Sequence, residues 1–175
     1  MEEEALFSNK TTLNAELVKE ATVGNSKTIF SIYQMIGILS AGMLAFMIPQ
    51  SIGAGIKAEE ALIALAAPVC LSAVFLYLGF LLPKQEAKRW EKHKEAVIPG
   101  RAAVNRYRFF SEYMLFKAAT ADKEVKIEYK EIRKVKETAR LILMSTAKKQ
   151  LFIIEKKGFD KKDKALPFIR NIKEK

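Results

Sequence analysis

Two long apolar runs dominate the pattern of hydrophobic and polar positions along the chain. Charged residues are absent from Thr28 to Ile56 and again from Ala61 to Pro83. Within these stretches, residues 29–48 and 61–82 would form helices of about 30 Å and about 33 Å, long enough to cross the hydrocarbon core of a bilayer. Neither run has the polar face that a surface helix of a soluble domain carries. The pattern therefore predicts two membrane-spanning helices.

The short segment between the two runs predicts a tight turn outside the membrane. It contains Pro49, Gly53 and Gly55, which favour the end of the first helix and a change of direction. A cleaved signal peptide is the main alternative for the first run, but such a peptide has a basic start and a short apolar core. Because the chain opens with Met1-Glu2-Glu3-Glu4, we expect a retained transmembrane hairpin over residues 28–83.

The N-terminal segment, residues 1–27, predicts one short helix from Thr11 to Val23. Thr11 or Thr12 is the candidate cap, and Leu13 and Leu17 fall on one side of the helix. A helix of this length is marginal on its own. We therefore expect it to lean on the membrane surface or on the C-terminal part of the chain. A solvated leader is an equal alternative.

After the second apolar run, the spacing of apolar residues changes from that of a helix to that of a strand. Residues 84–100 predict a charged juxtamembrane helix and linker that ends at Pro99-Gly100. Beyond it, alternation of apolar and polar residues around Tyr107 and across 125–129 is typical of half-buried antiparallel strands. Two further runs, 141–144 and 151–154, are apolar throughout, which indicates strands that are either central or covered by a helix.

Residues 101–175 thus predict a small domain of five or six short antiparallel strands in one sheet, closed by a C-terminal helix. Asp160 is the expected cap of that helix, and Ile172 its end. The fold class is membrane α plus cytoplasmic α+β, with a two-helix transmembrane hairpin followed by a small antiparallel β domain.

The charge distribution predicts an orientation. The net charge is +10, and it belongs entirely to residues 83–175, which hold 26 Lys and Arg against 13 Asp and Glu. The turn between the apolar runs has one basic residue, Lys57, whereas five follow the second run within a short distance. Because basic residues accumulate on the cytoplasmic side, we expect a multi-pass protein of the cell membrane with both termini in the cytoplasm.

A basic cytoplasmic domain is attracted to the anionic inner leaflet by about 1 kcal/mol for each residue close to the surface. The candidate membrane-surface contacts are Lys84, Lys88, Arg89, Lys92, Arg133, Lys134, Lys148 and Lys149. Solvated strand faces combined with the orientation bias explain the same charges equally well. Nucleic acid is not expected as a partner, because the alternation places aromatic residues such as Tyr107 and Phe109 partly inside.

Catalytic chemistry has little support in the sequence. The chain has one histidine, His93, and one cysteine, Cys70, so it offers no metal-ligand set and no nucleophile–base pair. We expect no enzyme activity, catalytic residue, metal site or cofactor, and we expect Cys70 to be a small packing residue. The absence of ionisable residues from both apolar runs argues against a pump or transporter made by this chain alone.

Three segments carry a family resemblance: Phe-Phe-Ser-Glu-Tyr at 109–113, the stretch 127–138 with Ile-x-Tyr-x-x-Ile-x-x-Val, and the stretch 150–159. With the two preceding apolar runs, they resemble the YcxB-like family of bacterial membrane proteins. The resemblance extends from about residue 28 to the end. It implies a two-helix anchor that carries a pleckstrin-homology-like C-terminal domain, with no agreed molecular activity. Glu155 stands where many members have proline.

The same motifs supply markers of the domain core. We expect Tyr129 and Ile132 to pin the exit of a strand to the core, and Phe159 to seat the last helix. These are packing residues, so they predict fold rather than chemistry.

Our main hypothesis is a membrane-anchored, non-enzymatic interaction or regulatory protein. Its cytoplasmic domain would bind a protein partner or anionic lipid headgroups at the inner leaflet. The alternative is a small subunit of a transport or pore-forming membrane assembly. Small residues at fourfold spacing, Gly37, Ala41 and Ala45, favour contact within the hairpin over dimerisation, so a homo-oligomer remains open but without support.

Overall fold

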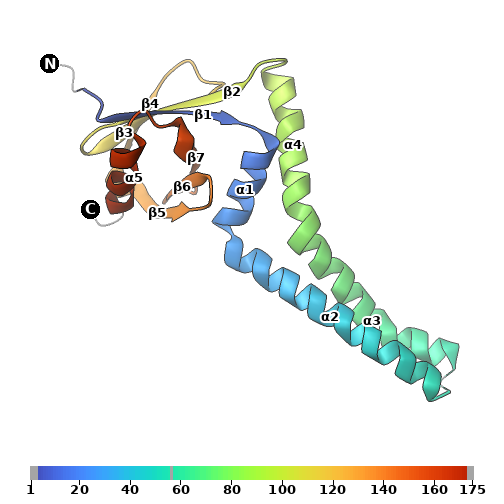
Figure 1. The fold of residues 1–175 in the computed structure, drawn as a ribbon. Coiled ribbons are helices and arrows are strands. Elements are labelled where there is room, and N and C mark those ends of the chain that lie inside the picture. The colour runs from blue at the N-terminus through green and yellow to red at the C-terminus, as the bar shows by residue number, and fades with distance from the viewer. Residues whose placement is uncertain (1–3, 56, 173–175) are drawn as a thin grey trace. The chain divides into compact units, whose positions relative to one another are not determined.

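The chain folds as two units, one interrupted by the other. The computed structural model describes residues 4–55 and 57–172. One unit combines Met1–Asn25 with Ala87–Lys175 and is called the β unit below. The other, Ser26–Glu86, is called the hairpin unit. The hairpin unit is therefore an insertion in the sequence of the β unit, after the first strand and the first helix (Figure 1).

The hairpin unit is built from α2 (Lys27–Gly53), α3 (Ala58–Leu76), a π-helical turn η1 (Tyr77–Leu81) and the start of α4 (Leu82–Val97). The expectation that Pro49 would stop the first helix is wrong. Proline removes only its own N–H donor, and the helix resumes behind it, where the Ala54 N–H donates to the Gln50 carbonyl at 2.9 Å. The chain turns at Gly55, whose φ of +66° suits glycine.

Small and polar residues join the two arms of the hairpin. A Cβ on Gly37 would lie 2.9 Å from the Leu76 side chain, so only glycine permits this approach. The Ser72 hydroxyl donates to the Gly37 carbonyl at 3.4 Å, and Gln34 Nε2 donates to the carbonyl of Gly79 at 3.1 Å. The predicted role of Gly37 inside the hairpin is confirmed. Cys70, in contrast, is exposed and does not pack as expected.

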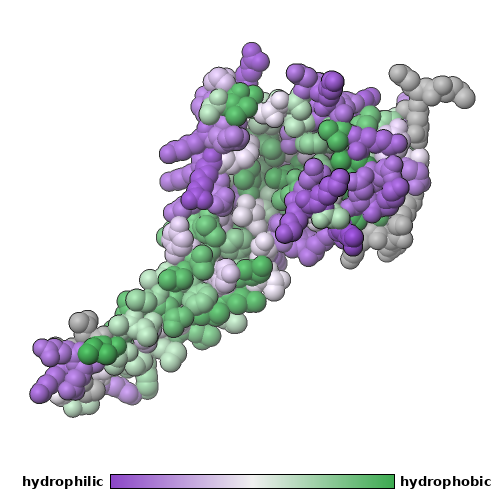
Figure 2. Space-filling model, turned by 180° about the vertical axis from the view of Figure 1, so that it is seen from behind, coloured by the Kyte–Doolittle hydropathy of each residue, from purple (hydrophilic) through white to green (hydrophobic). Residues whose placement is uncertain are grey.

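The outside of the hairpin is apolar. Two helices among the described residues are long and apolar enough to cross a membrane. Only 11% and 6% of the residues in their most apolar stretches are buried inside the structure. Figure 2 shows this surface as a green length of hairpin that ends in hydrophilic side chains at its tip. The long apolar helices predicted from the sequence are therefore present.

The described residues of the β unit form seven strands in two antiparallel sheets, where one sheet was expected. Sheet A has the order β1-β2-β3-β4 and sheet B the order β5-β6-β7. The strands are β1 (Phe7–Leu13), β2 (Ala103–Phe109), β3 (Tyr113–Lys117), β4 (Val125–Glu128), β5 (Ile132–Glu137), β6 (Leu141–Thr146) and β7 (Leu151–Glu155). A 3-10 turn at Tyr129–Glu131 separates β4 from β5, so the chain changes sheet there instead of extending the first one.

The N-terminal segment is part of this unit and not a separate leader. The helix expected from Thr11 begins later, as α1 (Ala15–Asn25), and the Leu17 N–H donates to the Asn14 side chain at 2.9 Å. Thr11 and Leu13 instead lie in β1, opposite Asn105 and Ala103 of β2. The strand was missed because its inward side chains include polar ones, Asn9 and Thr11, which hide the usual alternation.

β1 also links the two sheets. The Glu155 N–H donates to Thr11 Oγ1 at 2.8 Å, and Asn9 Nδ2 donates to the Glu155 carbonyl at 2.8 Å. Proline has no N–H, so a proline at position 155 could not form this bond between β7 and β1, whereas Glu155 does. Gly158 allows the same approach, since a Cβ there would lie 2.3 Å from the Lys10 carbonyl oxygen.

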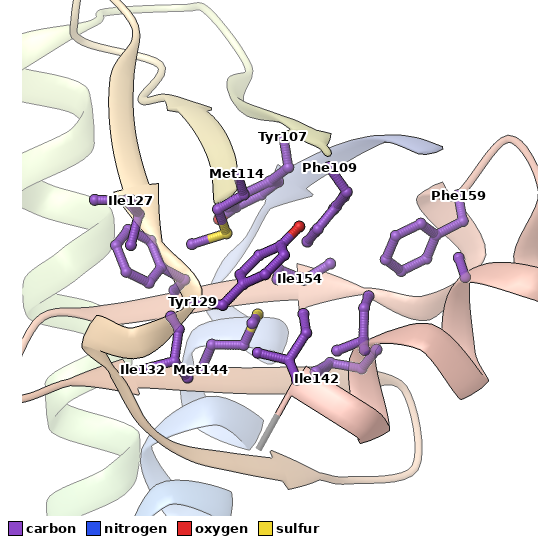
Figure 3. Close-up of a cluster of buried hydrophobic side chains, with 14 residues drawn as sticks. Tyr107, Phe109, Met114, Ile127, Tyr129, Ile132, Ile142, Met144, Ile154 and Phe159 are labelled. Carbon is purple, nitrogen blue, oxygen red and sulfur yellow. The ribbon is translucent and has the colours of Figure 1, made fainter. Parts of the chain in front are cut away.

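The main core lies between the sheets and α5 (Lys162–Asn171), as Figure 3 shows. Tyr129 and Ile132 are both buried in it on either side of the 3-10 turn, and Phe159 is buried against Phe109, with ring centroids 5.7 Å apart. All three belong to the main core. Asp160 does not cap α5 as expected; it accepts hydrogen bonds from the Ser8 N–H and hydroxyl at 3.1 and 3.0 Å, and so ties α5 to β1.

The outer face of sheet B has a second, smaller core. Leu17 and Ala21 of α1 pack on Leu141 and Leu143 of β6. This explains why β6 is apolar on both faces, and it confirms that the short N-terminal helix leans on the C-terminal part of the chain.

Candidate functional site

The eight predicted membrane-surface residues are all exposed, and they form two groups. Lys84, Lys88, Arg89 and Lys92 lie on α4. Arg133 and Lys134 lie on β5, and Lys148 and Lys149 lie in the turn between β6 and β7. The structure therefore divides the predicted set according to the elements that carry it.

The second group is brought together by strand pairing. Ile132 pairs with Thr146, and the Ala147 N–H donates to the Glu131 carbonyl at 3.3 Å. The β6–β7 turn therefore lies beside the start of β5. Arg133 falls at a register shift in this pairing, and Lys149 adopts a left-handed φ of 63° in the turn. Four cations that are up to 16 positions apart in sequence thus share one end of sheet B.

Lys136 extends this group to the C-terminal end of α1, although it was not among the predicted contacts. Its Nζ donates to the Gly24 carbonyl at 3.1 Å and also to the Asn25 carbonyl. Asn25 is the last residue of α1, and the apolar hairpin follows it directly in the chain. The role of Lys136 depends on a contact between residues 111 positions apart, so local pattern could not reveal it. We call Arg133, Lys134, Lys136, Lys148 and Lys149 the basic strip.

The charges of the basic strip are not neutralised within the chain. Among residues 4–55 and 57–172, no carboxylate forms an ion pair with any of its five members. Partial burial lowers the pKa of Lys136, and the positive charge of Lys134 lowers it further. Crowded cations without an internal counter-charge attract anions from outside.

The nearest strand carboxylate has other partners. Glu137 accepts hydrogen bonds from Arg170 of α5 at 2.5 and 3.1 Å and pairs with Lys156 Nζ at 3.2 Å. The bond from Arg170 is the main cause that lowers the pKa of Glu137 to about 2, and Lys156 adds to it against partial burial. Glu137 therefore joins α5 to sheet B and leaves the basic strip uncompensated.

Ionic contacts hold α1, whose end accepts the hydrogen bonds of Lys136, against sheet B. Arg140 donates to Glu20 at 2.7 Å and to Glu16 at 3.3 Å. Partial burial acts to raise the pKa of Glu20, but hydrogen bonds from Thr138 and Arg140 outweigh it and lower that pKa. A Cβ on Gly24 would lie 2.5 Å from the Thr138 side chain, so α1 lies close against the β5–β6 turn.

This arrangement can hold an anionic group by charge and hydrogen bonding. In the described part of the chain, no three His, Cys, Asp or Glu side chains are grouped to hold a metal. Tyr107 and Phe109, the aromatics of the basic β2 strand, are buried as the alternation predicts. The exposed chemistry of the β unit is therefore mainly that of lysine and arginine.

Comparison with known proteins gives one family match. Residues 110–172 match the model of a family described as YcxB-like protein. No curated protein matches the chain. Among solved structures, it is similar to the C-terminal domain of an unknown protein from Leishmania infantum, with 16% identity and a TM-score of 0.33 over 43% of this chain and 73% of that chain. This degree of likeness carries no argument about fold or function.

The family match spans β3 to β7 and α5, and it includes the whole basic strip. It does not reach β1, the hairpin unit or β2, although the sequence resemblance, from about residue 28 onward, also covered the hairpin unit and β2. Over residues 110–172 the resemblance to the YcxB-like family is confirmed by this match.

Proposed function

We propose that the chain is a membrane-anchored interaction protein whose basic strip binds anionic lipid headgroups at the cytoplasmic surface. The observation that carries this proposal is the bond from Lys136 to Asn25, the last residue before the apolar hairpin. It links the basic strip to the point where the chain leaves the β unit.

The exposed side chains of the hairpin unit support its insertion in a bilayer. Large apolar residues on α2 and α3 point outward, with Phe46 exposed by 67% and Ile63 by 77%. In water, such a surface would be far larger than the apolar patches of soluble monomers. A bilayer removes this cost at roughly 25 cal/mol per Å² of apolar area. The excess of basic residues outside the turn supports a cytoplasmic β unit.

The strand arrangement supports a pleckstrin-homology-like fold for the β unit. Sheets of four and three antiparallel strands are closed by a C-terminal helix. In this fold, the hairpin unit is an insertion between the first and second strands.

Covalent continuity brings part of the basic strip close to the proposed membrane surface. Lys136 contacts Asn25 directly, and Lys134 lies two strand residues away, about 7 Å along β5. This is within the Debye length of roughly 8–10 Å at physiological ionic strength. Each such cation contributes up to about 1 kcal/mol of attraction to an anionic leaflet.

Lysine reactivity tests the proposal in the full chain. The protein is placed in nanodiscs of zwitterionic or of partly anionic lipid and treated with an amine-reactive reagent, and modification is measured at each lysine by mass spectrometry. We expect Lys134, Lys148 and Lys149 to react less in anionic nanodiscs, and salt to restore their reactivity. Lys162 is the control, because it follows β7 in the chain, at the end of that strand opposite the β6–β7 turn. Equal reactivity in both lipids would overturn the proposal.

One observation favours the alternative of a transport or pore-forming subunit. The π-helical turn at Tyr77–Leu81 receives a hydrogen bond from Gln34 inside the proposed span, and such turns are frequent at functional sites. Replacing residues 28–82 with an unrelated hairpin distinguishes the two. An anchor tolerates this exchange, whereas a working hairpin loses its activity.

A further inference from the structure

An apolar groove lies between β4 and the β6–β7 turn. Its lining residues are Phe116, Val125, Ile127, Gln150, Leu151 and Phe152, and its volume is about 320 Å³. Gln150 is the only polar residue in this lining. The volume is at the lower end of the range for small-molecule sites, roughly 300–1,000 Å³. We call this feature the apolar groove.

The groove has a fixed floor and an exposed rim. Phe116 and Phe152 meet edge to face with ring centroids 5.1 Å apart, and Ile127 is buried beside them. Val125 is exposed by 52% although it is a large apolar residue on a strand. Among the described residues, β4 pairs with β3 alone, so no strand covers this side of sheet A. A preformed apolar surface of this kind gains free energy when an apolar ligand covers it.

The charges around the groove are positive at one end. The turn that supplies Gln150 also carries Lys148 and Lys149, which are exposed and form no ion pair within the described chain. Glu124, next to Val125, is already paired with Arg108. Lys126 lies over the Tyr113 ring, 4.2 Å from its centroid. Lys148 and Lys149 therefore place two positive charges, without an ion pair among the described residues, next to Gln150 of the groove lining.

We propose that the apolar groove binds the acyl chain of a single-chain anionic lipid, such as a fatty acid, whose headgroup pairs with Lys148 and Lys149. An apolar lining with cations at one end matches an amphiphile with one apolar and one anionic end. This inference rests on the proposed function, because a membrane-facing basic strip places the groove next to a source of such lipids.

A photoreactive fatty acid tests this in the full chain. The protein is reconstituted in phosphatidylcholine nanodiscs with a diazirine-bearing palmitic acid analogue, irradiated, and mapped by mass spectrometry. We expect labelled residues in the groove in addition to those on the hairpin, and a several-fold loss of groove labelling when unlabelled palmitate is added in excess. No groove labelling, or labelling that palmitate does not reduce, would overturn the inference.

Two variants sharpen the result. Val125→Trp fills the groove at an already exposed position and should abolish groove labelling, whereas Val97→Trp, at a site on α4 exposed by 48%, should not change it. Lys148→Glu with Lys149→Glu should reduce labelling by the acid but not by the matching diazirine alcohol. If Val125→Trp is still labelled in the groove at the wild-type level, the groove is not the binding site. If the double lysine variant loses labelling by the acid and by the alcohol equally, Lys148 and Lys149 do not bind the headgroup.

The two proposals fail separately. If Lys134 is protected by anionic lipid but the groove is not labelled, the groove inference fails alone. If the groove is labelled and blocked by Val125→Trp but Lys134 shows no lipid-dependent protection, the proposed function of the strip fails and the groove stands.

Discussion

The hairpin unit and the β unit use apolar residues in opposite ways. Phe46 on α2 is 67% exposed, whereas Phe109 on β2 is fully buried. The hairpin unit keeps its few polar contacts inside, such as Gln34 to Gly79, and presents apolar side chains outward. The β unit buries its apolar residues and exposes lysine and arginine. One chain thus contains an apolar surface and a basic, polar surface, on two units that are joined after α1.

The largest expected effect separates the two kinds of apolar residue. Phe109→Ala removes a ring from the main core and should lower the free energy of unfolding of the β unit by about 3–5 kcal/mol. Phe46→Ala on the outside of α2 should change it by less than about 0.5 kcal/mol. Denaturant unfolding of the chain in nanodiscs, followed by tyrosine absorbance, measures both. Comparable losses would remove the distinction between the two units.

A smaller effect tests whether β1 belongs to the β unit. Thr11→Val leaves the buried Glu155 N–H and the Asn9 side chain without their bonds to the hydroxyl, which should cost about 1–3 kcal/mol. Thr12→Val changes the neighbouring exposed residue of the same strand and should cost less than about 0.5 kcal/mol. The same unfolding measurement applies. If both variants match the wild type, β1 does not join sheet A to β7 in the way described.

The acid side of the stability curve gives a third test. The pKa of Glu137 is about 2 in the folded chain against an ordinary 4.5, so its contribution is present above about pH 4.5 and is lost as the pH falls toward 2. Glu137→Gln should cost about 1 kcal/mol at neutral pH. Its unfolding free energy should approach that of the wild type by pH 2. A constant difference across this pH range would contradict the ionic role.

The smallest effect concerns the packing of α1 on sheet B. Arg140→Gln weakens the contacts to Glu16 and Glu20, and because Arg140 itself is solvent-exposed, this variant should lower the free energy of unfolding less than the others. Hydrogen exchange should show faster amide exchange in α1, with no change in α5. Unchanged exchange in α1 would mean that the apolar contact of Leu17 and Ala21 holds the helix without Arg140.

The residues explain which features could be predicted from the sequence. Charge-free runs revealed the long apolar helices, and the alternation around Tyr107 and the position of Phe159 revealed strands and core. β1 was hidden because Asn9 and Thr11 point inward as polar residues. The change of sheet at Tyr129–Glu131 depends on a local turn that hydropathy does not encode.

The candidate site was predictable only in part. Arg133, Lys134, Lys148 and Lys149 were identified by charge, but their grouping requires the pairing of β5 with β6. The part played by Lys136 depends on α1 packing across sheet B, and the apolar groove depends on side chains from three strands. Such features arise from tertiary contacts between distant segments.

The central claim is that the hairpin unit crosses the membrane and returns, with its turn on the far side from the β unit. Single-cysteine variants in a Cys70→Ser background test it most directly: Ala54→Cys in the turn and Ala147→Cys between β6 and β7, both exposed positions. In intact cells stripped of any outer layer, a membrane-impermeant maleimide should label Ala54→Cys at once and Ala147→Cys only after permeabilisation. Labelling of Ala54→Cys only after permeabilisation, or of both positions in intact cells, would contradict the claim.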